Sequence, residues 1–142
     1  MAYSSDTDLL KEISEAELAR LTGDTSGQTI DTDRTDYARE NADALIDAYL
    51  FGRYDVPFTG DIDPIIKKVS IDLTLANLYD FAYSKATVPS TITWRKINAV
   101  KLLKDIRSGD VALVNIGIGI GTPPAILSNN NPMKRKYHKR IL

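Results

Sequence analysis

The 142-residue chain contains no cysteine and a single histidine, His138. The lack of cysteine excludes a disulfide framework and thiolate chemistry, and a structural zinc site is not expected. No uninterrupted apolar run approaches the roughly 20 residues that a membrane-spanning helix needs. The acidic, polar N-terminus also lacks the pattern of a signal or transit peptide. We therefore expect a soluble intracellular protein without a membrane partner.

The sequence offers no recognisable catalytic or metal-binding constellation. His138 has no cysteine or second histidine with which to form a metal site or a nucleophile–base triad. Asp31 and Asp33 are spaced as in a calcium loop, but Asp36 occupies the position that needs glycine, and Ala42 replaces the bidentate glutamate. The acidic residues fall in predicted helix caps and exposed turns, and nothing marks one of them as buried. We expect no enzymatic activity, no metal and no cofactor.

The net charge of −1 hides an uneven distribution of charge along the chain. Residues 1–66 carry 15 acidic and 5 basic side chains, a net charge of −10. Residues 67–142 carry 4 acidic and 13 basic side chains, a net charge of +9. Such a division suits attraction between unlike faces of neighbouring subunits, and it suits equally the neutralisation of one half by the other within one fold.

Apolar residues at helical spacing predict a mainly α fold, a compact bundle of four to five helices over residues 1–110. Residues 6–21 form one helix or two, because Ser14 and Glu17 make a capping-box pattern. Longer helices are expected from Asp31 or Thr32 to Gly52, from Asp61 or Asp63 to about residue 83, and over residues 91–107 before Gly109. The predicted buried stripe of the second helical region is Ala38, Ala42, Leu45 and Tyr49, and Ala44, Ile46, Ala48 and Leu50 extend its apolar surface, so burial on several sides is expected. The predicted buried stripe of the last helix is Trp94, Ile97, Val100, Leu103 and Ile106.

Helical periodicity ends after Gly109, and residues 111–142 are predicted to form an extended strand segment and a basic C-terminal arm. The sequence GIGIGT resembles a phosphate-binding glycine loop, but Pro123 and Pro124 follow it and no helix pattern opens there. A strand whose bare glycine face lies against another chain is the favoured interpretation. The candidate inter-subunit strand comprises Ile116, Gly117, Ile118, Gly119, Ile120 and Gly121.

The end of the chain is strongly basic and carries one aromatic residue. Such a segment could follow a phosphate backbone or dock on an acidic protein surface, and chain ends are also commonly solvated. The terminal Ile141 and Leu142 favour docking, since an apolar end suits a binding surface. The candidate contact residues, for DNA or for a partner protein, are Lys134, Arg135, Lys136, Tyr137, Lys139 and Arg140.

The stretch YLFGRYDVPF at residues 49–58 is predicted to be a structural joint and not an active site. Gly52 ends the preceding helix, and Pro57 begins the approach to the next one. Arg53 is expected to pair with an acid or to cap helix carbonyls. The aromatic residues expected to pack this corner are Tyr49, Phe51, Tyr54 and Phe58.

Three blocks of sequence, at residues 44–58, 64–79 and 102–113, resemble a family of small proteins encoded in Mu-like phages and prophages. That family is similar to the head-completion or head–tail connector (adaptor) proteins of tailed phages. The resemblance covers roughly residues 5–113, and its most specific part is the block with Gly52, Arg53, Tyr54 and Pro57. Residues 114–142 match no motif.

The resemblance implies a structural virion protein without catalytic residues. It implies a helical protomer that forms a homo-oligomeric ring, typically twelve-fold, in the phage neck, assembled in the cytoplasm of the host. The implied partners are the portal protein and a tail-side connector or tail terminator protein, and DNA passes through the ring. The alternative function, which follows from the basic C-terminal segment, is a small nucleic-acid-binding regulatory protein.

Overall fold

The computed structural model describes residues 2–83 and 85–114. Within these ranges the chain is mainly α-helical, as predicted, and no strand is present. The predicted strand over residues 116–121 and the basic residues 134–140 lie outside the described residues. The helices are α1 (Asp6–Leu9), α2 (Glu15–Leu21), α3 (Thr32–Leu50), α4 (Pro64–Ala82) and α5 (Ser90–Ser108), with a short 3-10 helix η1 (Lys85–Thr87) before α5.

The helix ends follow the local signals in the sequence. Ser14 caps α2, so the first helical region does divide into two short helices. Asp31 caps α3 and Asp63 caps α4, each through a side-chain oxygen that accepts a backbone N–H. Gly109 ends α5 in the left-handed conformation, with φ of 94°. Ser5, one residue before the predicted helical region, caps α1, and its side-chain oxygen accepts the N–H of Asp8.

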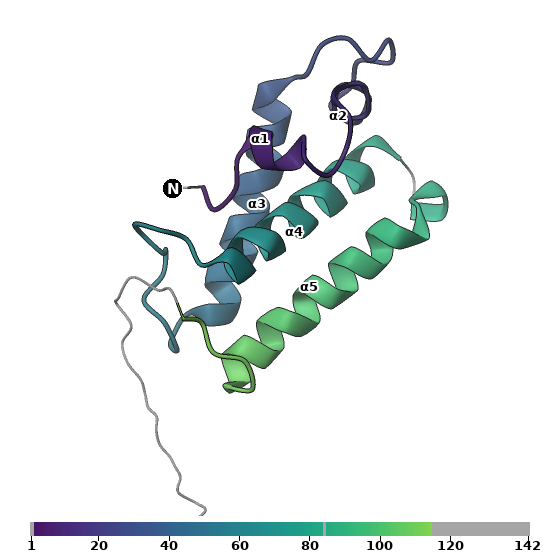
Figure 1. Cartoon of the computed structure of the whole chain (residues 1–142). Helices are drawn as coiled ribbons and strands as arrows, with labels where there is room; N and C mark the ends of the chain where they lie inside the picture. The colour runs from purple at the N-terminus through teal and green to yellow at the C-terminus, as the bar shows by residue number, and fades with distance from the viewer. Residues whose placement is uncertain (1, 84, 115–142) are drawn as a thin grey trace, which may run out of the picture.

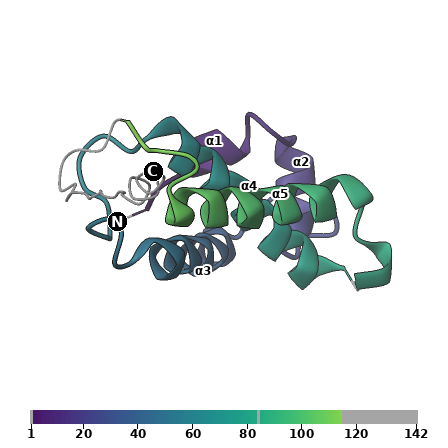
Figure 2. The same cartoon turned by 90° about the horizontal axis from the view of Figure 1, so that it is seen from below.

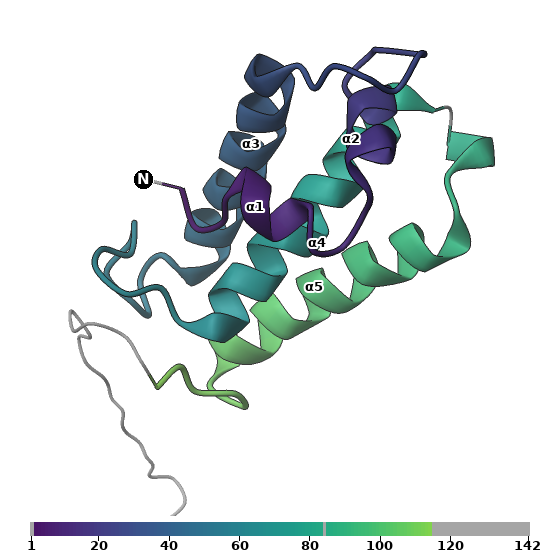
Figure 3. The same cartoon turned by 45° about the horizontal axis from the view of Figure 1, so that its top comes forward.

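The three long helices form the body of the protein, with α4 between its neighbours. α4 and α5 run side by side in opposite directions, and α3 lies behind α4 (Figure 1). Seen from below, α3 and α5 approach each other near the end of α5 (Figure 2). α1 crosses α3 and α4, and α2 covers the C-terminal half of α4 (Figure 3). None of the described helices combines the length and hydropathy that a membrane span requires.

Two apolar clusters follow from this arrangement. The larger one lies between α3, α4 and α5 and includes Ile46, Ile66 and Leu103. The smaller one lies where α1 and α2 cover α4, and it includes Leu18 and Leu75. Because α4 contributes to both clusters, it is buried on two sides, which explains why its apolar surface is wider than one stripe.

The predicted inner side of α5 is wrong in its first half. Trp94 is 61% exposed and Ile97 is 51% exposed. A second stripe with equally good helical spacing faces the core instead, formed by Ile92, Ala99, Leu103 and Ile106. In α3 the predicted stripe is wrong at Leu45, which is exposed, whereas Ile46 and Leu50 of the wider apolar surface are buried. In both helices two apolar stripes compete, and only the position of the neighbouring helix selects between them.

Candidate functional site

The predicted joint follows α3 as a tight turn. α3 ends at Leu50, and the N–H groups of Arg53 and Tyr54 donate to its carbonyl oxygen at 3.0 and 3.1 Å. Gly52 lies inside this turn with φ of 93°, a backbone conformation that other residues rarely adopt. The exposed Pro57 follows a cis peptide bond with Val56.

The aromatic residues of the joint divide between the core and the solvent. Tyr54 meets the buried Phe58 edge-on, with ring centroids 6.2 Å apart. Tyr49 is partly buried against the larger cluster. The expectation that Phe51 also packs the corner is wrong, because its side chain is 79% exposed. Leu50 directs its side chain into the core, and its neighbour Phe51 therefore points in a different direction.

Arg53 lies across the end of α5. Its Nη2 atom is only 3.0 Å from the position that a Cβ on Gly109 would occupy. Its guanidinium carbon is 5.9 Å from the ring centroid of Tyr54. Within residues 2–83 and 85–114 its guanidinium forms no ion pair, so the expected pairing with an acid is not seen there. The joint therefore brings the ends of α3 and α5 together.

The joint also holds the chain where it leaves the helical body, a role that the sequence did not reveal. The N–H of Leu113 donates to the Tyr54 hydroxyl at 3.3 Å, and Leu113 is buried in the larger cluster. The N–H of Val114 donates to Oδ2 of Asp63 at 3.0 Å. The other carboxylate oxygen of Asp63 accepts the N–H of Ile65 at the start of α4. One helix cap thus also fixes the start of the C-terminal segment.

Replacing Gly52 with valine is expected to lower the free energy of unfolding by about 1–2 kcal/mol, the usual cost of a left-handed conformation for a residue with a Cβ. No atom lies within 4 Å of the position of that Cβ, so the cost comes from the backbone and not from a clash. Urea denaturation measures the change. Gly52→Asn is the matched control and should cost less, because asparagine tolerates this conformation. Wild-type stability of Gly52→Val would contradict the interpretation of this stretch as a joint.

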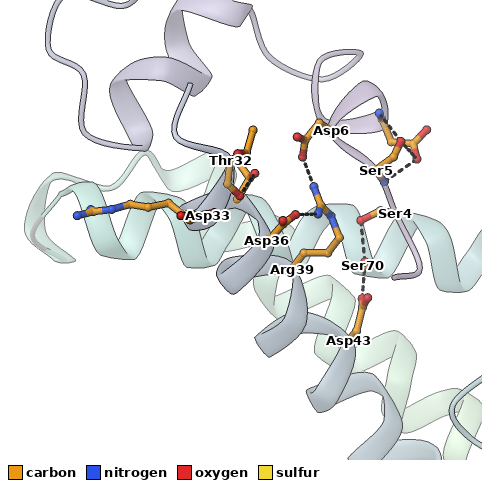
Figure 4. A network of polar contacts seen from close by, with 12 residues as sticks. Ser4, Ser5, Asp6, Thr32, Asp33, Asp36, Arg39, Asp43 and Ser70 are labelled. Carbon is orange, nitrogen blue, oxygen red and sulfur yellow. Dashed lines mark hydrogen bonds and ion pairs between the residues drawn. The ribbon is translucent and has the colours of Figure 1, made fainter. Parts of the chain in front are cut away.

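A buried polar network attaches the N-terminal segment to the long helices (Figure 4). The carboxylate of Asp43 on α3 accepts the hydroxyl of Ser70 on α4 at 2.6 Å and the N–H of Tyr3 at 2.8 Å. The hydroxyls of Ser70 and Ser4 are 2.9 Å apart. The expectation that no acidic residue is buried is therefore wrong, and it is also wrong for Asp72 on α4.

Two further side chains extend this attachment. Arg39 on α3 forms ion pairs with Asp6 of α1 and with Asp36 (Figure 4). The hydroxyl of the buried Tyr3 donates to Asp47 on α3 and accepts the N–H of Phe58. The only sequence signal for these anchors is the presence of acids one turn apart, at positions 43 and 47, within an otherwise apolar part of a helix.

The pKa values of the acids in this region shift in opposite directions. Burial raises the pKa of Asp43, although its hydrogen bonds from Ser70 and from the Tyr3 N–H partly oppose the rise. Burial also raises the pKa of Asp47. For Asp8, burial alone would raise the pKa, but the hydrogen bonds from Ser5 and Lys11 and the charge of Lys67 together outweigh it, and the pKa is lowered.

We expect the stabilising contribution of Asp43 to decrease with increasing pH. A carboxyl whose pKa is raised by folding contributes fully below its unfolded pKa of about 3.9, and the contribution is lost as the pH rises through the folded value. The stability of the wild type relative to Asp43→Asn should therefore fall as the pH is raised above about 4. Urea denaturation of both proteins at a series of pH values measures the difference.

Asp8→Asn is the control for this experiment, since the sign reverses. The pKa of Asp8 is lowered by folding, so its contribution is present above the unfolded pKa and is lost as the pH falls through the folded value. The stability of the wild type relative to Asp8→Asn should decrease on acidification. The same pH dependence for both variants would contradict this assignment.

A groove of about 630 Å³ lies between the N-terminal half of α3 and the end of α4. Two exposed aromatic residues, Tyr37 and Phe81, line it, and the guanidinium of Arg34 lies 4.0 Å from the ring centroid of Phe81. The described part of the chain holds no group of three or more His, Cys, Asp or Glu residues that could bind a metal ion. The lining residues are Asp31, Asp33, Arg34, Tyr37, Ala38, Asn41, Asn77, Leu78, Asp80 and Phe81.

The sequence profile of the family described as Bacteriophage Mu, Gp36 matches residues 3–117, about four-fifths of the chain. The chain belongs to the Bacteriophage Mu Gp36 family. The resemblance to proteins of Mu-like phages is thereby confirmed. No curated protein matches the sequence. In this Gp36 family member the joint, the polar network and the groove all lie within the matched residues, whereas the basic residues 134–140 lie beyond them.

Proposed function

We propose that the protein is a head–tail connector (head-completion or adaptor) subunit of a tailed phage, which forms a ring between portal and tail through which DNA passes. The observation that carries this proposal is that two separate apolar patches are exposed. We define the groove patch as Tyr37 and Phe81, and the α5 patch as Trp94 and Ile97. In every one of these four side chains more than half of the surface is exposed.

Paired exposed apolar side chains of this size are typical of surfaces that bind another protein. Tyr37 and Phe81 line one groove, and Trp94 and Ile97 lie one turn apart on one helix. A subunit with two unlike patches suits a heterologous contact, in which one surface meets a different surface of the next copy, and such contacts close into rings. Membership of a Mu phage family supplies the biological context.

The charges of the helical body support assembly in the same way. Of the ion pairs in the described ranges, only Lys67 with Asp8 and Arg95 with Glu12 join the acidic residues 1–66 to the basic residues that follow. Several exposed acidic side chains of the first half, such as Asp33, Glu40 and Asp61, form no ion pair among the described residues. They are available to a neighbouring subunit or to another neck protein.

In the proposed assembly the ring, twelve-fold by the resemblance, binds the portal protein on one side and a tail-side connector or tail terminator on the other. The protein is located in the virion neck and its role is structural, not enzymatic. The buried acids fit such a role, because the polar contacts of Asp43 and Asp72 join segments of the fold to one another.

Electron microscopy of the purified full-length protein, alone and mixed with portal, tests the proposal. We expect rings in one or both samples, and size-exclusion chromatography with light scattering gives the number of subunits. A protein that stays monomeric at high concentration and also fails to bind portal would overturn the proposal.

A nucleic-acid-binding regulator is the alternative, and the five Lys and Arg side chains of residues 134–140 favour it. Its test is a DNA affinity that falls steeply with salt concentration and is lost when residues 133–142 are deleted. The helical body itself is acidic and would not add to such binding.

A further inference from the structure

The helical body and the C-terminal arm carry opposite charges of nearly equal size. Residues 1–114 contain 19 acidic and 13 basic side chains, a net charge of −6. Residues 115–142 contain five Lys and Arg side chains and no acidic residue, a net charge of +5. The arm is therefore a suitable ligand for an acidic surface of the body, provided that the body offers a matching site.

The groove between α3 and α4 matches the composition of the end of the arm. Asp31, Asp33 and Asp80 give it an acidic lining. Asp31 pairs with Arg34, whose guanidinium also lies over the ring of Phe81, and Asp80 pairs with Lys96. Among the described residues Asp33 forms no ion pair, so its charge is available to a ligand. The groove also offers apolar surface from Tyr37, Ala38, Leu78 and Phe81.

The last nine residues of the chain, KRKYHKRIL, combine the two properties that this groove would select. Their basic side chains complement the acidic lining, and Tyr137, Ile141 and Leu142 complement its aromatic and aliphatic surface. A nucleic acid fits less well, because the same acids would repel its phosphates.

We propose that the groove between α3 and α4 binds residues 134–142 of a neighbouring copy of this chain. The inference rests on the proposed function, since it specifies one contact of the ring. The arm of each subunit occupies the groove of the next one, and the charge of the body is largely neutralised only in the assembly.

The positions of the arm and of the groove on the subunit favour docking of the arm on a neighbouring copy. The arm begins at Val114, which is held by Asp63 at the N-terminal end of α4. The groove lies at the other end of α4, near Asp80, and the two ends are about 25 Å apart at 1.5 Å per helical residue. In Figure 1 the last described residues and the C-terminal end of α4 lie at opposite sides of the body. Because the arm leaves the subunit at one end and the groove lies at the other end, the same contact can repeat head to tail from one subunit to the next.

The length of the arm permits this contact. Residues 115–133 separate the last described residue from the basic segment, and 19 residues span up to about 65 Å when fully extended. This reach exceeds the roughly 25 Å between the two ends of α4. The basic segment can therefore reach a groove on an adjacent subunit as well as the groove of its own subunit, and the trapping experiment below distinguishes the two.

Disulfide trapping in the full-length chain tests the proposal, because the absence of cysteine means that only introduced residues can react. A Tyr37→Cys protein is mixed with an affinity-tagged Tyr137→Cys protein under mild oxidation, and the mixed dimer is quantified on a non-reducing gel. Tyr37 is 68% exposed, so its replacement should not disturb folding. Ser108→Cys, at an exposed position at the end of α5, is the control acceptor.

We expect about tenfold more mixed dimer with Tyr37→Cys than with Ser108→Cys, because docking raises the effective concentration of the arm at the groove. Adding Asp33→Lys to the Tyr37→Cys protein, or raising the salt concentration, should reduce the yield. Equal yields from the two acceptors would overturn the proposal. The proposal would also be overturned if a chain that carries both Tyr37→Cys and Tyr137→Cys formed only an intramolecular disulfide at every protein concentration.

Microscopy of the wild-type protein, in which both patches are intact, separates this inference from the proposed function. Rings without selective trapping at position 37 would refute arm docking and leave the connector proposal intact. The absence of rings, alone and with portal, would overturn both.

Discussion

Replacing Tyr3 with alanine is expected to lower the free energy of unfolding by about 3–5 kcal/mol, the range found for the truncation of buried aromatic residues. This would be a large effect for the third residue of a chain, since terminal residues are usually dispensable. Tyr3 is 1% exposed and packs on Phe58, with ring centroids 5.7 Å apart. Its hydroxyl joins Asp47 to the N–H of Phe58, so it connects the N-terminus, α3 and the joint. Urea denaturation measures the change.

Two control variants separate the causes of this effect. Tyr3→Phe keeps the ring and removes the hydroxyl, which leaves the buried N–H of Phe58 without its acceptor, and should cost about 1–3 kcal/mol. Tyr37→Ala removes an exposed tyrosine from the surface of α3 and should change stability by about 0.5 kcal/mol or less. If Tyr3→Ala were as stable as Tyr37→Ala, the N-terminal attachment would not contribute to the fold.

Replacing Trp94 with lysine is expected to weaken ring assembly by at least about 30-fold, which corresponds to the roughly 2 kcal/mol that a central interface tryptophan commonly contributes. The substitution places a charge in the α5 patch, where it would have to be desolvated on assembly. Because Trp94 is mostly exposed in the subunit, the free energy of unfolding should change by less than about 1 kcal/mol. Light scattering over a range of protein concentrations measures assembly, and circular dichroism confirms folding.

Phe51→Lys is the matched control for Trp94→Lys. Phe51 is also an exposed aromatic residue, but it belongs to neither the groove patch nor the α5 patch. We expect little change in assembly with this variant. The reverse result, in which Phe51→Lys prevents assembly and Trp94→Lys does not, would show that the ring uses a different surface from the two patches.

The elements that could be predicted from the sequence are those governed by near neighbours. Ser14, Asp31 and Asp63 cap helices because their side-chain oxygens accept N–H groups two or three residues later. Gly109 ends a helix because glycine adopts a positive φ without strain. Such interactions are complete within one turn of chain, so composition and spacing are enough to identify them.

The orientation of the helices could not be predicted in the same way. α5 has apolar residues on two stripes, and the sequence does not say whether Trp94 or Ile92 faces the core. The answer depends on α4 and α3, which both pack against α5. The exposure of Trp94, on which the proposed function partly rests, is therefore a tertiary property.

The buried polar contacts also depend on residues far apart in the sequence. Asp43 looked like an ordinary surface acid because its partners, Tyr3 and Ser70, are 40 and 27 residues away. Tyr54 and Asp63 likewise hold Leu113 and Val114 across 59 and 51 residues. No local pattern encodes such pairs, because each requires two helices to be in place first.

The sequence by itself determined the helices, their ends, the turn at Gly52 and the opposite charges of body and arm, since these follow from local backbone preferences and from composition. Only the tertiary structure decided which apolar side chains are exposed, that acids lie inside the body, and that the joint holds the start of the arm. The physical reason is that burial results from packing between segments that are distant in the sequence. Whether a side chain lies in the core or at the surface therefore depends on which helices pack against it.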